Sequence, residues 1–170
     1  MVSRVGSCLG LLLLLGGASP EAFAKDTGRL QKIRYHFTGE GVYTDIEVQG
    51  DRLIYRALVK HPERCARWFA SRPCWGPEDL STREVRLSQA EVGELQRLAK
   101  ESGLLELKGV YGVKDELRRY YSRSLTLTVD GVERTVEYRS APDAPPEPPG
   151  FATATAWLLK IVRAKFPQAG

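Results

Sequence analysis

The stretch SLTLTVDGVERTVEY, Ser124–Tyr138, decides the fold because it holds two strands and the turn that joins them. Apolar and polar residues alternate in each half, which is typical of a strand with one buried face. The pair Asp130-Gly131 between the halves is typical of a tight hairpin turn. The sequence therefore predicts strands from Tyr120 to Val129 and from Val132 to Tyr138. The inward side chains of the first strand are Leu125, Leu127 and Val129.

Three further strands are predicted before this hairpin, as an antiparallel meander. Glycine-containing turns at residues 39–41 and 49–51 separate them. Their inward side chains are Ile33, Tyr35 and Phe37; then Val42, Thr44, Ile46 and Val48; then Leu53, Tyr55, Ala57 and Val59. The opposite faces carry Lys32, Arg34 and His36 on the first strand and Tyr43, Asp45, Glu47 and Gln49 on the second. A fourth strand is predicted from Thr82 to Leu87.

Two helices complete the pattern. Ser88 is a suitable N-cap with Glu91 as its capping-box partner, so a helix is predicted from Gln89 to about Ser102, with Gly103 at its end. The apolar residues Val92, Leu95, Leu98 and Ala99 form its buried stripe. A second helix is predicted from Phe151 to Phe166, and it presents Phe151, Ala154, Leu158, Ile161, Val162 and Phe166 to a core.

This order of elements predicts an α+β fold with a mostly antiparallel sheet of about six strands and two helices on one face. A disulfide-closed insertion at residues 60–80 interrupts the strands, and Pro62 is placed to begin a short helix that contains Cys65. Residues 109–119 are expected to form an exposed loop or an irregular edge. The segment APDAPPEPPG, residues 141–150, is interpreted as a stiff proline-rich connector inside one domain of residues 25–170.

The first 24 residues resemble an export signal. Arg4 precedes a leucine-rich run, and Ala22-Phe23-Ala24 fits a signal-peptidase site, so we expect cleavage after Ala24. The apolar run is shorter than the roughly 20 residues of a membrane-spanning helix, which makes an uncleaved anchor the weaker alternative. The expected location is periplasmic or secreted, with no membrane span after cleavage.

The charge of the chain is mildly basic. The formal net charge is +4, and removal of residues 1–24 takes away one basic and one acidic residue, Arg4 and Glu21. The mature charge therefore stays at +4, which weakly indicates acidic partners and does not indicate a nucleic-acid-binding protein.

The segment CARWFASRPCW, residues 65–75, contains both cysteines that would remain after cleavage. An even number of cysteines in an exported chain favours a disulfide between Cys65 and Cys74. A thioredoxin-type redox pair has two residues between its cysteines and is disfavoured by the eight found here. A zinc site with His61, Cys65 and Cys74 remains an alternative if the thiols are free, although three ligands are fewer than a structural zinc site uses.

The same segment carries residue types that are enriched at binding hot spots. The candidate partner-binding residues are Arg64, Arg67, Trp68, Phe69, Arg72 and Trp75. The simpler interpretation is that the three aromatic residues pack the loop against the sheet while the arginines are solvated.

No catalytic motif was found in the sequence. G-x-S-x-G and HExxH are absent, and GEG at residues 39–41 is interpreted as a hairpin turn. Asp45 and Glu47 share one strand face about 7 Å apart, a separation found in two-carboxylate hydrolases. Alternating charges of this kind are more typical of a solvated strand face. The loop with Asp115, Glu116, Arg118 and Arg119 is likewise interpreted as solvated and not as a site. We therefore expect no enzymatic activity, no cofactor and no metal.

The element order resembles a class of small bacterial α+β domains that includes the emfourin protease-inhibitor family. The resemblance is carried by IRYHFTGEGVY, LSQAEVGELQRLAKESGLLEL, SLTLTVDGVERTVEY and the apolar C-terminal helix, and it covers most of Leu30 to Phe166. The cysteine loop and the proline-rich connector depart from the emfourin pattern. The resemblance implies inhibition of a thermolysin-like protease and assigns no inhibitory residue.

The sequence thus favours an exported, non-enzymatic protein that binds an envelope or secreted protein and no nucleic acid. A protease inhibitor is the narrower form of this hypothesis. The alternatives are a hydrolase of an envelope polymer that uses Asp45 and Glu47, and a polyanion-binding protein.

Overall fold

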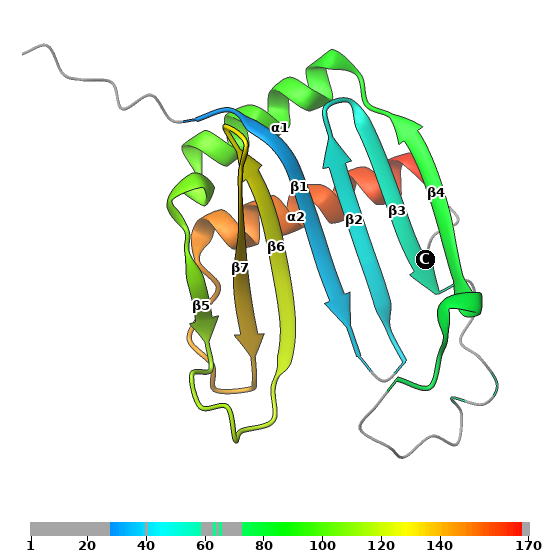
Figure 1. The fold of residues 1–170 in the computed structure, drawn as a ribbon, viewed down its shortest axis with the longest axis vertical. Helices are drawn as coiled ribbons and strands as arrows, with labels where there is room; N and C mark the ends of the chain where they lie inside the picture. Colours follow the sequence, from blue (N-terminus) through cyan, green and yellow to red (C-terminus); the bar gives the residue numbers. More distant parts are fainter. Residues whose placement is uncertain (1–27, 40, 59–62, 64, 66–72, 168–170) are drawn as a thin grey trace, which may run out of the picture.

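A computed structural model describes residues 28–39, 41–58, 63, 65 and 73–167 and shows an α+β fold. Seven strands form one sheet in the order β4-β3-β2-β1-β6-β7-β5 (Figure 1). The strands are β1 (Leu30–Thr38), β2 (Tyr43–Gln49), β3 (Arg52–Leu58), β4 (Leu80–Arg86), β5 (Gly109–Gly112), β6 (Tyr121–Val129) and β7 (Val132–Ser140). The helices are α1 (Gln89–Glu101), α2 (Pro149–Lys165) and the short 3-10 helices η2 (Pro77–Asp79) and η3 (Leu104–Glu106).

The sheet has one strand more than the sequence indicated. Six strands pair antiparallel, from β4 through β7, whereas β5 pairs parallel with β7 at the edge of the sheet. This strand lies in the segment interpreted as an exposed loop or irregular edge. Its residues, GVYG, have no apolar alternation, so only the pairing with β7 identifies it as a strand. The prediction of about six strands was therefore wrong by one.

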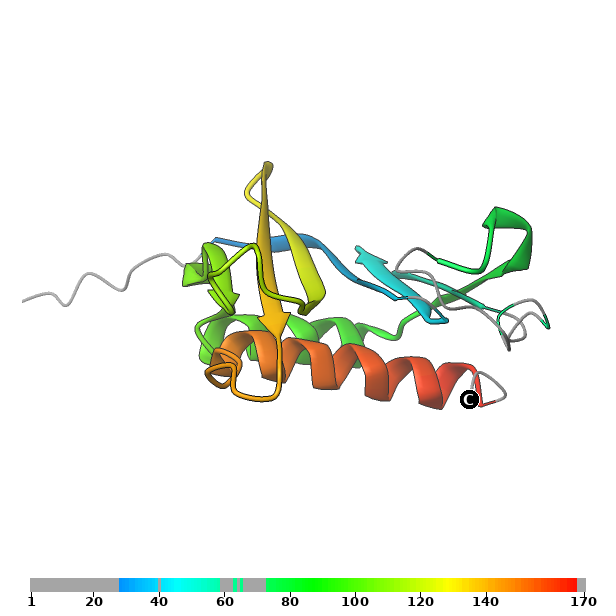
Figure 2. The same ribbon diagram turned by 90° about the horizontal axis from the view of Figure 1, so that it is seen from below.

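The core lies between one face of the sheet and the two helices, which Figure 2 shows on the same side of the sheet. Most of the predicted inward residues of β1, β2, β3 and β6 form the sheet side of this core, but Val42 is 46% exposed just before β2, so its prediction was wrong, and Val59 lies outside the described residues. The ring of Phe166, just after α2, stacks on Tyr55 of β3, and Phe151 contacts Tyr138 of β7. Trp157 of α2 is also buried, although the sequence pattern did not place it in the core.

Local signals in the sequence set the ends of the elements. Asp130 and Gly131 both have positive φ, 50° and 80°, as a type I′ hairpin turn requires. The capping box of α1 is present with both of its hydrogen bonds, and Gly103 follows α1 in the left-handed conformation with φ 73°. These three signals are confirmed.

The proline-rich connector is attached to the rest of the domain at several points. The hydroxyl of Tyr138 donates to the carbonyl of Pro145 at 2.7 Å, and Arg118 pairs with Asp143. Arg123 forms an ion pair with Glu147. Helix α2 begins at Pro149, so the last two residues of the predicted connector belong to the helix.

Candidate functional site

Three segments meet at one end of the sheet, which we call the loop end. They are the β1–β2 turn, the segment Pro73–Gly76 that ends the cysteine loop, and the loop of residues 113–120 between β5 and β6 (Figure 1). A surface hollow of about 450 Å³ lies between them. The residues that line it are Thr38, Gly39, Pro73, Arg119, Tyr120, Tyr121 and Ser122.

Trp75 is held against the open face of the sheet. Its indole Nε1 donates to the carbonyl of Gly39 at 3.1 Å. Its ring meets Tyr43 edge to face, with centroids 5.0 Å apart, and Tyr43 meets His36 in the same way at 5.4 Å. Trp75 follows Cys74, which is joined to Cys65 in a disulfide. The end of the cysteine loop is therefore attached to this end of β1 and β2 by ring packing and a hydrogen bond, next to the disulfide that closes the loop.

The other wall of the hollow combines aromatic rings with arginine. The guanidinium of Arg139 lies over the ring of Tyr120, 4.8 Å from its centroid. Arg139 is held there by Glu137, whose carboxylate lies 2.9 Å away. This contact lowers the pKa of Glu137 and raises that of Arg139. Such a cation–π contact orders the aromatic side of the loop end.

Exposed apolar side chains gather at the same end. Leu117 is 99% exposed, and Val42 and Tyr121 are each 46% exposed. These are three of the five large hydrophobic residues that are exposed in the described part of the chain. An exposed apolar group rimmed by charged and aromatic residues is typical of a surface that contacts another protein.

A separate cluster of charges surrounds Asp45 on the open face of the sheet. Asp45 lies directly between His36 of β1 and Arg56 of β3 in the strand register. Its carboxylate is completely buried and accepts hydrogen bonds from Arg34 Nε at 2.9 Å and from Arg56 Nη1 at 3.3 Å. His36 Nδ1 lies 3.4 Å from Oδ2 without the alignment of a hydrogen bond.

The neighbours of Asp45 keep it ionised. Burial alone would raise the pKa of this carboxyl, but the contacts of His36 and Arg34 and the charge of Arg56 outweigh burial and lower the pKa to about 2. The same contact raises the pKa of Arg34. A carboxylate covered by two arginines and ionised at every physiological pH is unsuited to the acid and base steps of a hydrolase.

The expectation of a solvated face is therefore wrong at Asp45. The sequence shows alternating charges, but Arg34 and Arg56 come from the strands on either side and fold over the carboxylate. Glu47, the other carboxylate of the predicted pair, is held by Lys32 at 3.6 Å.

Of the predicted partner-binding residues, only Trp75 can be placed. Arg64, Arg67, Trp68, Phe69 and Arg72 lie outside the described residues, as do His61 and Pro62. Arg119 belongs to the loop that was expected to be solvated, and Tyr120 and Tyr121 were not among the candidate site residues. The run RRYY at residues 118–121, next to a hydrophobic Leu117 among charges, is the signal that was available.

The disulfide removes Cys65 and Cys74 as ligands of the alternative zinc site. Over the described ranges, no group of three or more His, Cys, Asp or Glu residues is placed to hold a metal ion. No helix in that part of the chain is long and apolar enough to cross a membrane. Comparison of the sequence with models of known protein families found no match, and comparison with curated proteins found none either.

Proposed function

We propose that this chain is an exported, non-enzymatic protein that binds another protein of the envelope or of the secreted fraction through its loop end. The observation that carries the proposal is that Val42, Leu117 and Tyr121 are all exposed at the loop end, where Tyr121 also lines the hollow. Burial of apolar surface is the main favourable contribution to association, and Tyr, Trp and Arg are the residue types enriched at hot spots.

Export is part of the proposal because of the leader-like first 24 residues. A disulfide is compatible with an oxidising compartment, in which such bonds form and persist. The cysteine loop then contributes a covalently closed segment, and Pro73 near its end lines the hollow. A closed loop loses less conformational entropy on binding than an open one, which favours recognition.

Protease inhibition is the narrower form of the proposal, and its support is the resemblance to the emfourin family. An inhibition assay with a purified thermolysin-like protease tests it directly. Inhibition that is lost on substitution at the loop end would support this form, and a protease that keeps full activity at micromolar concentrations of the protein would contradict it.

The two alternatives have less support. The hydrolase requires Asp45 and Glu47 to face a substrate, whereas Asp45 is buried under Arg34 and Arg56. The polyanion-binding protein requires available positive charge on the surface. On the open face of the sheet, Lys32, Arg34, Arg52 and Arg56 are each paired with a carboxylate.

Leu117→Asp tests the loop end as a binding surface. The side chain of Leu117 is almost fully exposed, so the substitution is expected to leave the fold intact and to weaken partner capture by about tenfold or more. Val132→Asp is the matched control, because Val132 is 69% exposed at the β6–β7 turn, at the opposite end of β6. The measurement is quantitative affinity capture from the native envelope fraction with the wild type and both variants. Equal capture by all three would contradict the proposal.

A further inference from the structure

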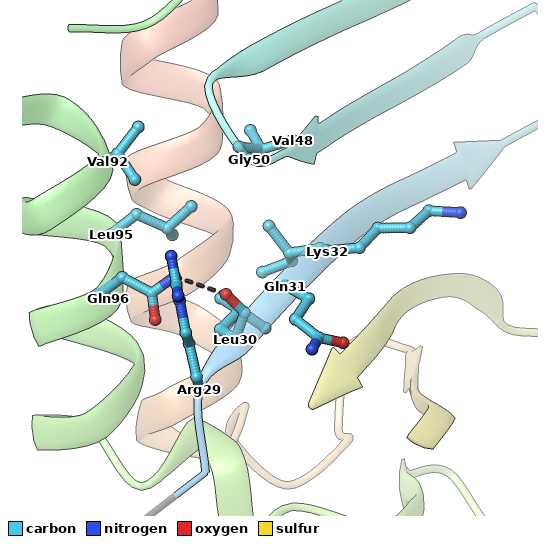
Figure 3. Close-up of a pocket in the computed structure, with 10 residues that line it drawn as sticks. Arg29, Leu30, Gln31, Lys32, Val48, Gly50, Val92, Leu95 and Gln96 are labelled. Carbon is cyan, nitrogen blue, oxygen red and sulfur yellow. Dashed lines mark hydrogen bonds between the residues drawn. The ribbon is translucent and has the colours of Figure 1, made fainter. Parts of the chain in front are cut away.

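A second hollow lies between the start of β1 and helix α1, at the opposite end of β1 from the loop end (Figure 3). Its volume is about 230 Å³. Apolar side chains that belong to the core or pack against it form its floor, namely Leu30, Ile33, Val48, Val92 and Leu95. Arg29, Gln31, Lys32, Gly50 and Gln96 complete the lining. The hollow therefore combines an apolar floor with a polar rim.

A β-bulge shapes this hollow. Leu30 pairs with Val129 and Lys32 pairs with Thr128, so Gln31 is an extra residue in β1. The side-chain amide of Gln96 reaches from α1 to the carbonyl of Leu30, as Figure 3 shows. Bulges disrupt the regular ladder and are over-represented next to functional sites. Here the irregularity lies next to the hydrogen bond from Gln96 of α1 to Leu30 of β1.

The rim is strongly basic. A neighbouring hollow shares Arg29 and Gln96 with the first and is also lined by Arg97 and Lys100. Arg29, Lys32, Arg97 and Lys100 line the two hollows against one acidic residue, Asp130, although the side chain of Lys32 points away from helix α1 (Figure 3). Lys32 and Arg97 are paired with Glu47 and Glu101. Within the described part of the chain, no ion pair engages the exposed side chains of Arg29 and Lys100.

We propose that this hollow binds a small amphiphilic anion, with a short alkyl chain on the apolar floor and a carboxylate or phosphate head group at Arg29, which also lines the neighbouring hollow together with Lys100. The volume sets the size of the chain. Because one water-sized group takes up about 30 Å³ of liquid volume, the hollow accommodates roughly eight non-hydrogen atoms. Charge-assisted hydrogen bonds to Arg29 orient the head group, and apolar burial supplies the remaining affinity.

This inference does not depend on the proposed function, because the hollow shares no lining residue with the loop end. Octanoate and octyl phosphate are suitable probes, and octanol is the uncharged comparison. We expect at least one of the two anions to shift the backbone amide NMR signals of Gly50, Val92 and Gln96 in the purified, isotope-labelled protein. Octanol should bind about tenfold more weakly, since it lacks the charged contact. The anion that binds with the higher affinity shows whether the hollow prefers a carboxylate or a phosphate head group.

Two variants localise the binding. Arg29→Gln removes the charge at the rim and should weaken binding of the anions by about tenfold, with little effect on octanol. Val92→Phe fills the hollow and should weaken binding of all three compounds. Arg163→Gln is the matched control, because Arg163 is exposed on α2 and lines neither hollow.

Three results would overturn the inference. These are the absence of shifts at Gly50, Val92 and Gln96 with both anions at millimolar concentration, equal affinity for octanol and octanoate, and an equal loss of affinity in Arg29→Gln and Arg163→Gln. Thermal melts of each variant accompany the titrations. If Val92→Phe fails to fold, the affinities of Arg29→Gln and Arg163→Gln still test the inference, because both arginines are exposed and their substitution should leave the fold intact.

Discussion

Asp45 is the side chain whose environment departs most from that of an ordinary strand residue. Burial of an ionised carboxylate is unfavourable unless charges and hydrogen bonds compensate for it. Arg34 and Arg56 supply both, and each keeps part of its own side chain in solvent. The arrangement links β1, β2 and β3 on the open face of the sheet. The stability of the fold should therefore depend on the carboxylate of Asp45.

Asp45→Asn should lower the free energy of unfolding by about 2 kcal/mol, because it removes the charge that Arg34 and Arg56 share. Glu47→Gln, two residues along the same face, breaks a more exposed pair with Lys32 and should cost at most about 0.5 kcal/mol. Urea denaturation at neutral pH measures both. Similar losses in the two variants would show that the cluster is no more important than a surface ion pair.

The depressed pKa of Asp45 predicts a loss of stability in acid. In the folded protein the pKa is about 2, against an ordinary value of 3.8, so the unfolded chain takes up the proton first as the pH falls. The contribution is complete above about pH 5 and is lost progressively towards pH 2, with a total of about 2 kcal/mol. Denaturation curves of the wild type and Asp45→Asn, measured from pH 6 to pH 2, should converge in acid. A difference that does not change with pH would contradict this assignment.

Helix α1 shows how one element is specified locally and then used in tertiary packing. The hydroxyl of Ser88 accepts from the amide of Glu91, and the carboxylate of Glu91 accepts from the amide of Ser88 at 2.7 Å. The same carboxylate pairs with Lys165 of α2 at 2.8 Å. Together these contacts lower the pKa of Glu91. Glu91, the capping-box residue in the first turn of α1, therefore also connects this helix to α2.

Ser88→Ala should destabilise the protein by about 1 kcal/mol, since it removes the N-cap of α1. Ser102→Ala is the control at the other end of the same helix. The hydroxyl of Ser102 is buried and makes no hydrogen bond, so its removal should leave the stability unchanged within about 0.5 kcal/mol or increase it. Thermal denaturation of both variants gives the comparison. An equal loss in the two would show that the capping box contributes nothing specific.

At the scale of the whole molecule, export, processing and disulfide formation can be tested in one measurement. We expect the protein isolated from its native host to begin at Lys25 and to gain no mass from thiol-labelling reagents, because Cys8 is removed and Cys65 is bonded to Cys74. Intact mass spectrometry before and after reduction should show a gain of two hydrogens. A chain that keeps residues 1–24 would contradict export by this leader, and free thiols would contradict the bond in the native protein.

The sequence by itself determined the features that depend on neighbouring residues. Alternation predicts the strands of the meander and of the hairpin, Asp130-Gly131 predicts the turn, and Ser88 with Glu91 predicts the start of α1. Each of these signals acts over a few residues, because turn geometry and capping hydrogen bonds are local. The disulfide could also be predicted, since an even number of cysteines in an exported chain favours pairing.

The tertiary structure alone decided the features that depend on residues far apart in the chain. Strand β5 exists because β7 offers it a parallel partner, and Asp45 is buried because two neighbouring strands bring arginines over it. The loop end joins Gly39, Pro73 and Tyr121. The hollow at α1 likewise needs the bulge at Gln31 and the helix together. Burial, pairing and concavity are properties of the packed chain, so no local pattern in the sequence encodes them.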